Sequence, residues 1–240
     1  MSRFVAFNIA IFFSAVVGGT LPLLISWSDR VLHLFLALTT GIFLGAVFLH
    51  LIPELAHQDP GITSWLLVLG GLLIVYALET LIFPTRYAST EESHKLVGYA
   101  TLAGLSVHSY ADGQALAAGF LLPSLGMPIF LSIVTHKVAE TFSLCTVFEL
   151  AEMSRRKTIV LLGVFSLITP LGAASGYVFF AGSGGPLHFV IPTAIATGTF
   201  LYVALCDLMP EVFHRPHDNA AKLLLLLVGA AFMLALRAIE

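Results

Sequence analysis

Charged side chains are scarce in this chain of 240 residues: only 10% are Asp, Glu, Lys or Arg, whereas 58% are hydrophobic. Soluble globular domains carry about 25% charged residues, and a water-soluble fold of this length could not hide so much apolar surface. The scarcity of charge therefore excludes an ordinary soluble domain and indicates that lipid forms part of the solvent. The net charge of −3 neither favours nor excludes an anionic partner.

Cysteine is nearly absent as well. Cys145 and Cys206 are the only two, and both lie inside apolar runs, so a disulfide framework is not expected. We expect each to behave as a small buried hydrophobe. The first apolar run is too long for the core of a signal peptide and has no clear small-residue cleavage site, so we interpret it as a retained helix.

Long apolar runs, by contrast, recur along the whole chain. A helix needs about 20 mostly apolar residues to cross the hydrocarbon core of a bilayer. Eight segments satisfy this requirement, and polar or turn-forming residues separate them. The predicted fold is therefore an all-α integral membrane protein, with residues 1–240 forming a single transmembrane domain. The predicted spans are about 4–27, 31–54, 64–83, 97–120, 128–150, 158–181, 187–211 and 220–239.

Lys and Arg are missing from the loops after spans 2, 4 and 6, and this asymmetry orients the chain. The loops after spans 1, 3, 5 and 7 hold Arg30, Arg86, Lys95, Arg155, Arg156, Lys157, Arg215 and Lys222. Because short cytoplasmic loops are enriched in basic residues, the odd-numbered loops are predicted to be cytoplasmic and both termini extracytoplasmic. Arg3 and Arg237, near the termini, weakly favour the opposite orientation.

Two segments of the chain resemble each other. Residues 41–54 and 198–211 share Gly, Phe, two Leu, Pro and Glu at the same spacing, with His50 in the place of Asp207. The two segments belong to spans that run in opposite directions, so we predict an inverted repeat of spans 1–3 and 6–8. Such repeats are typical of transporters that bind their substrate near the membrane midplane. The alternative is that each Pro-Glu pair simply ends a helix at the interface.

The most informative residues are ionisable ones inside predicted spans, where they are costly and are functional candidates. His108 precedes Asp112 by four residues in span 4, and His136 precedes Glu140 by four residues in span 5. Four residues advance a helix by about 6 Å and return the side chain to nearly the same face. Each pair can therefore close on one ion. The alternative is that each pair is an internal hydrogen bond between buried polar groups.

Two imidazoles and two carboxylates form a four-ligand site that suits a transition metal. Zinc accepts such ligands at about 2.0–2.2 Å, and Fe²⁺, Mn²⁺, Cd²⁺ and Co²⁺ would also fit. Calcium and magnesium prefer shells made only of oxygen, so the histidines argue against them. Two carboxylates would also balance the double charge of the ion.

Two further residues stand out inside spans. Lys137 follows His136 directly. Its ammonium either lies in the place of a second metal ion, paired with Asp112 or Glu140, or forms a structural ion pair elsewhere; the sequence leaves both open. Pro170 near the middle of span 6 predicts a kinked or unwound stretch, and broken helices often line transporter sites.

These motifs resemble the ZIP family (Zrt/Irt-like metal transporters), and the resemblance covers essentially the whole chain. Residues 108–113, His-Ser-Tyr-Ala-Asp-Gly, are similar to the family signature His-Asn/Ser-x-x-Glu/Asp-Gly. Residues 136–140 resemble its His-Lys/Glu-x-x-His/Glu segment, and residues 198–211 also look typical. Together these motifs are specific, although each alone would be weak.

The resemblance implies a transporter, not an enzyme, which carries a divalent metal, with zinc as the first choice, into the cytoplasm by alternating access. It implies an elevator-type movement in which spans 1, 4, 5 and 6 slide against spans 2, 3, 7 and 8. It also implies a homodimer in a plasma membrane or a bacterial inner membrane, without a nucleic-acid partner.

The chain departs from the family pattern at several positions. Lys137 stands where a second-site ligand can occur, and Thr169 stands where some members have Glu, so we predict a single ion in the site. Ser109, Lys137 and Thr169 are expected to support the ligands or to replace a second site. Ala111 replaces a Pro that part of the family carries, and the predicted linker 85–95 holds only His94 in place of a His-rich loop.

The predicted route has an entrance and an exit. Glu54 and His57 are expected to line the entrance, and His33 and His188 are expected to be interfacial. The residues expected at the exit are Asp207, Glu211, His214 and His217. The rival hypothesis is an intramembrane metal-dependent hydrolase; zinc proteases of this kind usually carry His-Glu-x-x-His, a string that does not occur here.

Overall fold

A computed structural model describes residues 2–24, 27–82, 90–121, 126–180, 186–214 and 217–237, and within these ranges it contains helices and no strands. The predicted all-α class is therefore confirmed. The helices are α1 (Ser2–Thr20), α2 (Asp29–Gly45), α3 (Ile52–Gln58), α4 (Ile62–Ile82), α5 (Thr90–Leu121), α6 (Gly126–Leu150), α7 (Arg155–Ser166), α8 (Ile168–Phe180), α9 (Pro186–Tyr202), α10 (Met209–Phe213) and α11 (Asn219–Arg237).

Six stretches among the described residues are helical, long and apolar enough to cross a membrane: Ser2–Leu24, Asp29–Gln58, Ile62–Leu81, Arg155–Phe180, His188–Phe213 and Asn219–Arg237. They correspond to predicted spans 1, 2, 3, 6, 7 and 8. Helices α5 and α6 occupy the fourth and fifth predicted ranges. Their buried polar residues, the candidate ligands among them, lower the hydropathy of these two helices.

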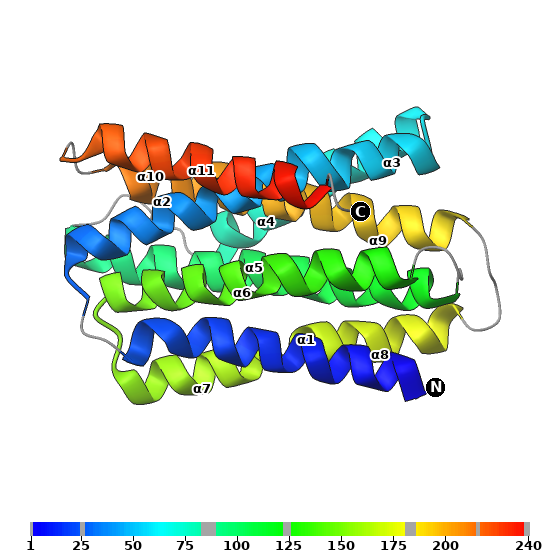
Figure 1. Cartoon of the computed structure of the whole chain (residues 1–240), viewed down its shortest axis with the longest axis horizontal. Coiled ribbons are helices and arrows are strands. Elements are labelled where there is room, and N and C mark those ends of the chain that lie inside the picture. The colour runs from blue at the N-terminus through cyan, green and yellow to red at the C-terminus, as the bar shows by residue number, and fades with distance from the viewer. Residues whose placement is uncertain are drawn as a thin grey trace.

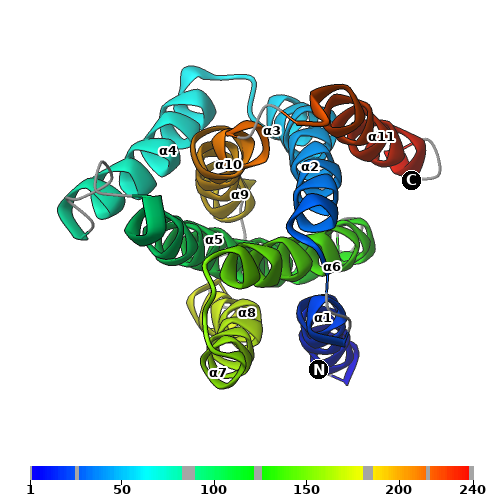
Figure 2. The same cartoon turned by 90° about the vertical axis from the view of Figure 1, so that its left-hand side faces the viewer.

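Two central helices separate the other helices into two groups (Figure 2). Helices α5 and α6 lie across the middle, with α1, α7 and α8 on one side and α2, α4, α9 and α11 on the other. Helix α1 packs on α6 and α8 packs on α5, whereas α11 packs on α2 and α4 packs on α9. The candidate ligands therefore lie between the two outer groups.

Two π-helical turns interrupt the long helical segments that contain residues 41–54 and 198–211. The turn η2 (Ala46–Leu51) joins α2 to α3, and η3 (Val203–Leu208) joins α9 to α10. Both turns begin five residues after the glycine of their segment, and Pro53 or Pro210 follows each. Proline has no N–H and its ring clashes with the carbonyl four residues earlier, which explains why the regular hydrogen-bond ladder is lost there.

Glycines at corresponding positions of the two segments allow the closest helix contacts. A Cβ atom added to Gly41 would lie 1.9 Å from the carbonyl oxygen of Leu226, and one added to Gly198 would lie 1.9 Å from that of Val68. Both glycines therefore let a neighbouring backbone touch the helix, as small residues do in membrane helix packing.

The interruption predicted near Pro170 is confirmed. Helix α7 ends at Ser166 and α8 begins at Ile168, with Leu167 between them donating its N–H to Val164 over 3.1 Å. Helix α5 has no such break, in agreement with the absence of proline at Ala111. It begins at Thr90, so the later part of the predicted linker 85–95 is helical and the earlier part lies outside the described residues. A helix can extend beyond the length that the bilayer requires.

One expectation about burial was wrong. Cys145 is buried as predicted, but Cys206 is exposed. Cys206 directly precedes the buried Asp207. Successive helical residues point about 100° apart. Since Asp207 points inward, Cys206 points toward the outer surface of the helix.

Candidate metal centre

The four predicted ligands converge on one point between α5 and α6. His108 and Asp112 project from α5, and His136 and Glu140 project from α6. All four are buried, and each can offer one ligand atom such that these atoms all lie within 4.8 Å of one another. The spacing of four residues within each helix gives the local face, and the packing of α5 against α6 brings the two faces together.

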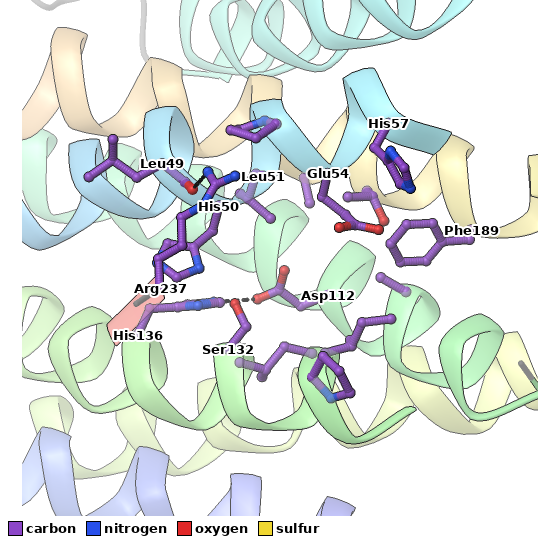
Figure 3. Close-up of a pocket in the computed structure, with 17 residues that line it drawn as sticks. Leu49, His50, Leu51, Glu54, His57, Asp112, Ser132, His136, Phe189 and Arg237 are labelled. Atoms are coloured by element: carbon purple, nitrogen blue, oxygen red, sulfur yellow. Dashed lines mark hydrogen bonds and ion pairs between the residues drawn. The ribbon is translucent and has the colours of Figure 1, made fainter. Parts of the chain in front are cut away.

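Asp112 is the centre of this arrangement. Its Oδ2 lies 3.1 Å from Nε2 of His108 and 3.0 Å from Nε2 of His136. Figure 3 shows the His136 ring and the Asp112 carboxylate facing each other at the end of a pocket. One carboxylate oxygen thus faces two imidazole nitrogens, which is an arrangement that a cation can occupy with little movement of the side chains.

The tautomer of His108 favours such a cation. Its Nδ1 lies 3.0 Å from the backbone carbonyl of Ala196 on α9, so the proton of a neutral ring belongs on Nδ1. The lone pair of Nε2 is then directed at the Asp112 carboxylate. Metal-binding histidines commonly donate their other N–H to a carbonyl in this way, which fixes the orientation of the ring.

Glu140 is held more tightly than the other three ligands. Its Oε1 accepts a hydrogen bond of 2.6 Å from Ser109, and its Oε2 is 2.7 Å from Nζ of Lys137. Lys137 Nζ also donates to Oγ of Ser109 over 2.8 Å. Lys137 therefore faces the site and pairs with Glu140, which answers the question that the sequence left open. The ammonium offsets one of the two carboxylate charges.

Phe200 of α9 covers the histidines and was missed by sequence reasoning. Its ring stacks on His108 with centroids 3.9 Å apart and lies 5.6 Å from the His136 ring. Its repeat equivalent Phe43 packs against it at 4.4 Å. The signal available in the sequence was the shared Phe of the two repeated segments. Thr169, predicted to support the site, is buried on α8.

A cavity of about 490 Å³ connects the predicted entrance with the ligands. Its lining includes Glu54 and His57 of α3 at one part and Asp112 and His136 at another (Figure 3). His50, Ser132, Phe189 and Arg237 also line it. Sequence reasoning had used Arg237 only for orientation; its guanidinium donates to the carbonyl of Leu49 in the π turn before Pro53.

The predicted exit residues do not line this cavity. Asp207 and Glu211 are buried, while His217 is exposed. The structure brings Glu211 and His214 together with His33, which proves to be only 3% exposed. The cavity is therefore lined by Glu54 and His57 and by two of the four candidate ligands, Asp112 and His136.

Comparisons with known proteins agree with these features. Residues 85–237 match the family model described as ZIP zinc transporter. The zinc transporter ZIP1 of Takifugu rubripes is 23% identical over 97% of this chain and 96% of its own length. The zinc transporter ZIP9 of Micropogonias undulatus is 27% identical over 89% of this chain and 86% of its own. The zinc transporter ZupT of Corynebacterium aurimucosum is 25% identical over 78% of this chain and 77% of its own.

Proposed function

This chain belongs to the ZIP zinc transporter family, and we propose that it carries a divalent transition metal, zinc first, into the cytoplasm through the site formed by His108, Asp112, His136 and Glu140. It is a multi-pass integral membrane protein. The observation that carries the proposal is the convergence of these four buried side chains, two of which, Asp112 and His136, line a cavity.

The separations of the ligand atoms suit zinc. Ligands placed tetrahedrally at about 2.0–2.2 Å from an ion lie roughly 3.3–3.5 Å from one another. The Nε2 atoms of His108 and His136 lie 3.1 and 3.0 Å from Oδ2 of Asp112, and the largest separation in the group is below 4.8 Å. Movements of a few tenths of an ångström to about 1 Å would therefore complete the shell. Fe²⁺, Mn²⁺, Cd²⁺ and Co²⁺ are alternative substrates of the same site.

A single ion is proposed, because Lys137 fills the adjacent space with an ammonium paired to Glu140. With neutral histidines, the two carboxylates and this ammonium sum to one negative charge before the ion binds. A second divalent ion beside the first would bring four positive charges against two carboxylates in a buried setting. Ser109 supports this arrangement through its bonds to both Glu140 and Lys137.

The proposed route runs from the cavity to the opposite end of the molecule. Metal would enter past Glu54 and His57, bind at the four ligands, and leave past Asp207, Glu211, His214 and His217. Helix α3 lies toward one end of the bundle and α10 toward the other (Figure 1). The excess of Lys and Arg in the odd-numbered loops supports the second end as cytoplasmic, with eight spans and both termini outside.

An elevator movement within a single domain is the proposed mechanism. Helices α1, α5, α6, α7 and α8 would slide against α2, α3, α4, α9, α10 and α11, carrying the ligands from one end to the other. The corresponding π turns and glycine contacts support the inverted repeat that such a movement uses. Homodimeric assembly in a plasma or bacterial inner membrane completes the proposal. The hydrolase alternative gains no support, since members of the family are transporters.

Uptake of ⁶⁵Zn into liposomes tests the proposed function. The Asp112→Asn and His136→Ala variants are expected to take up no more zinc than liposomes without protein, because each change removes a ligand at the centre of the site. His188→Ala is the matched control, since His188 lies on α9 outside the site, and its uptake should equal that of the unaltered protein. Normal uptake by both site variants would refute the proposed route.

A further inference from the structure

A second group of metal-ligating side chains lies at the end of the molecule opposite the cavity. It consists of His33, Glu211 and His214, hereafter the mouth cluster, whose ligand atoms all lie within 4.8 Å of one another. His33 is in the second turn of α2, and Glu211 and His214 belong to α10 and the residue after it. Helices α2 and α10 lie side by side in both views (Figures 1 and 2).

The His33 side chain is already oriented as a metal ligand. Helix α2 begins after Ser28, whose hydroxyl caps its first turn, and in that turn the carbonyl of Asp29 lies 2.6 Å from Nδ1 of His33. The proton of a neutral His33 ring is therefore held on Nδ1. The Nε2 atom is buried and has no hydrogen-bond partner among the described residues. Its lone pair points toward Glu211, with Oε1 3.9 Å away.

The remaining separations fit one ion. His214 Nδ1 lies 2.5 Å from the backbone carbonyl of Glu211, so the proton of a neutral ring is held on Nδ1 and Nε2 is the nitrogen left to bind an ion. The rings of His33 and His214 are 5.0 Å apart. Ligands of a tetrahedral zinc ion are roughly 3.3–3.5 Å apart, and the ligand atoms of the cluster lie within 4.8 Å of one another, so side-chain movements of about 1 Å bring Glu211 and both histidines into range. The side chain of His214 is 31% exposed, which leaves an open position for water and a way out for the ion.

The groups around the mouth cluster favour a moderate affinity for a divalent cation. Lys222 on α11 is close enough to act electrostatically on His33, and its positive charge opposes a cation at the mouth cluster. Two histidines with one carboxylate and an open position also resemble zinc sites that exchange their fourth ligand. A site of this kind holds an ion briefly and releases it.

We propose that the mouth cluster is a second transition-metal site, which binds Zn²⁺ or a chemically similar divalent ion separately from the four ligands on α5 and α6. The proposal rests on the proposed function only for the origin of the ion, which is cargo leaving the transport site. His33 on α2, Glu211 on α10 and His214 directly after α10 all belong to the same outer group of helices.

Counting bound zinc by elemental mass spectrometry, with the detergent-purified protein at dialysis equilibrium against a fixed concentration of free zinc, tests this site without any transport. The unaltered protein should retain two ions per chain. His33→Gln and His214→Asn should each retain one, and so should Asp112→Asn. The double variant Asp112→Asn/His33→Gln should retain none, while the control His188→Ala keeps two.

The proposal would be overturned if His33→Gln and His214→Asn left the number of bound zinc ions unchanged, both in the unaltered protein and in the Asp112→Asn background. His214→Asn keeps the test valid if His33→Gln fails to fold, because His214 is exposed. The visible spectrum of bound Co²⁺ gives an independent readout: Asp112→Asn should keep the bands of a His-carboxylate site, and His33→Gln should remove them in that background. If zinc uptake into liposomes fails while the protein still binds two zinc ions, the proposed function is contradicted and the second metal site is not.

Discussion

Glu140 and Asp112 are both carboxylates of the candidate site, yet their surroundings differ sharply. Asp112 faces two histidines, whereas Glu140 is held by Ser109 and Lys137. Removing one partner of a buried ion pair leaves the other charge uncompensated and destabilises the folded protein by about 3–5 kcal/mol. Lys137 therefore fixes Glu140, and its ammonium beside that carboxylate supports the proposal of one divalent ion in the site.

Phe200 provides a residue-scale test of how the His108 ring is positioned. Phe200→Leu should weaken zinc binding by roughly tenfold, the lower end of the effect of groups that orient metal ligands, because the leucine cannot stack on the ring. Phe43→Leu is the matched control: Phe43 is equally buried and packs on Phe200. Calorimetric titration with zinc measures both affinities. Equal weakening in the two variants would show that general packing, rather than the stacked ring, determines affinity.

At the scale of residues, the sequence predicted the candidate ligands and the supporting positions Ser109 and Lys137, but not the stacked ring of Phe200. The spacing of four residues placed each His and carboxylate on one helical face, and the structure brings all four together. The direction of Lys137 could not be derived, because a position 100° around a helix faces a site only once the neighbouring helices are placed. Phe200 could not be distinguished from an ordinary core residue.

Close backbone contacts join the elements that carry the site. A Cβ atom at Gly113 of α5 would lie 2.1 Å from the carbonyl oxygen of Thr169, and one at Gly172 of α8 would lie 2.2 Å from that of Tyr110. The two helices therefore touch backbone to backbone just where α5 carries Asp112. The break before Pro170 places this contact in α8, immediately after the interruption.

The Gly113→Ala substitution tests this contact. The added methyl group should force α5 and α8 apart and lower the stability by about 1–3 kcal/mol, as overpacking does, with a matching loss of zinc uptake. Gly163→Ala is the control, because a Cβ atom there meets nothing within 4 Å, and alanine favours the helix by up to about 1 kcal/mol. Thermal unfolding in detergent compares the two. Similar melting temperatures would argue against a tight α5–α8 contact.

Among the elements, the helices and the interruption of span 6 could be predicted, because apolar length and Pro170 act locally. The π turns could not. Pro53 and Pro210 lie at the ends of the predicted spans 31–54 and 187–211, whereas the structure continues in helix through α3 to Gln58 and through α10 to Phe213. Where the proline removes a backbone hydrogen bond, a side chain from elsewhere in the chain can replace it, as Arg237 does by donating to the carbonyl of Leu49. A local sequence pattern does not reveal such a distant partner.

On the scale of the whole molecule, one cavity is lined both by Glu54 and His57 and by the candidate ligands Asp112 and His136. Phe43 and Phe200 belong to the apolar core that packs beside the site. The proposed elevator movement would open the site to the opposite end by sliding the two groups of helices past each other. The orientation and the inverted repeat remain predictions from the sequence, and the cavity itself could not be derived from a local pattern.

Accessibility of cysteine substitutions tests this conformation. In a background with Cys206→Ser, Ser132→Cys should react with a membrane-impermeant thiol reagent, because Ser132 lines the cavity. Ser143→Cys, on the same helix but fully buried, should not react. Labelling is followed by the mass shift of the protein in intact proteoliposomes. Protection of Ser132→Cys together with labelling of Ser143→Cys would contradict a cavity open at this end.

Diffraction from crystals grown with zinc, recorded at the zinc absorption edge, tests the central claim most directly. We predict one anomalous peak between α5 and α6, at about 2.0–2.2 Å from atoms of His108, Asp112, His136 and Glu140, and no such peak in Asp112→Asn. Two peaks there, or none in crystals that bind zinc elsewhere, would contradict the account.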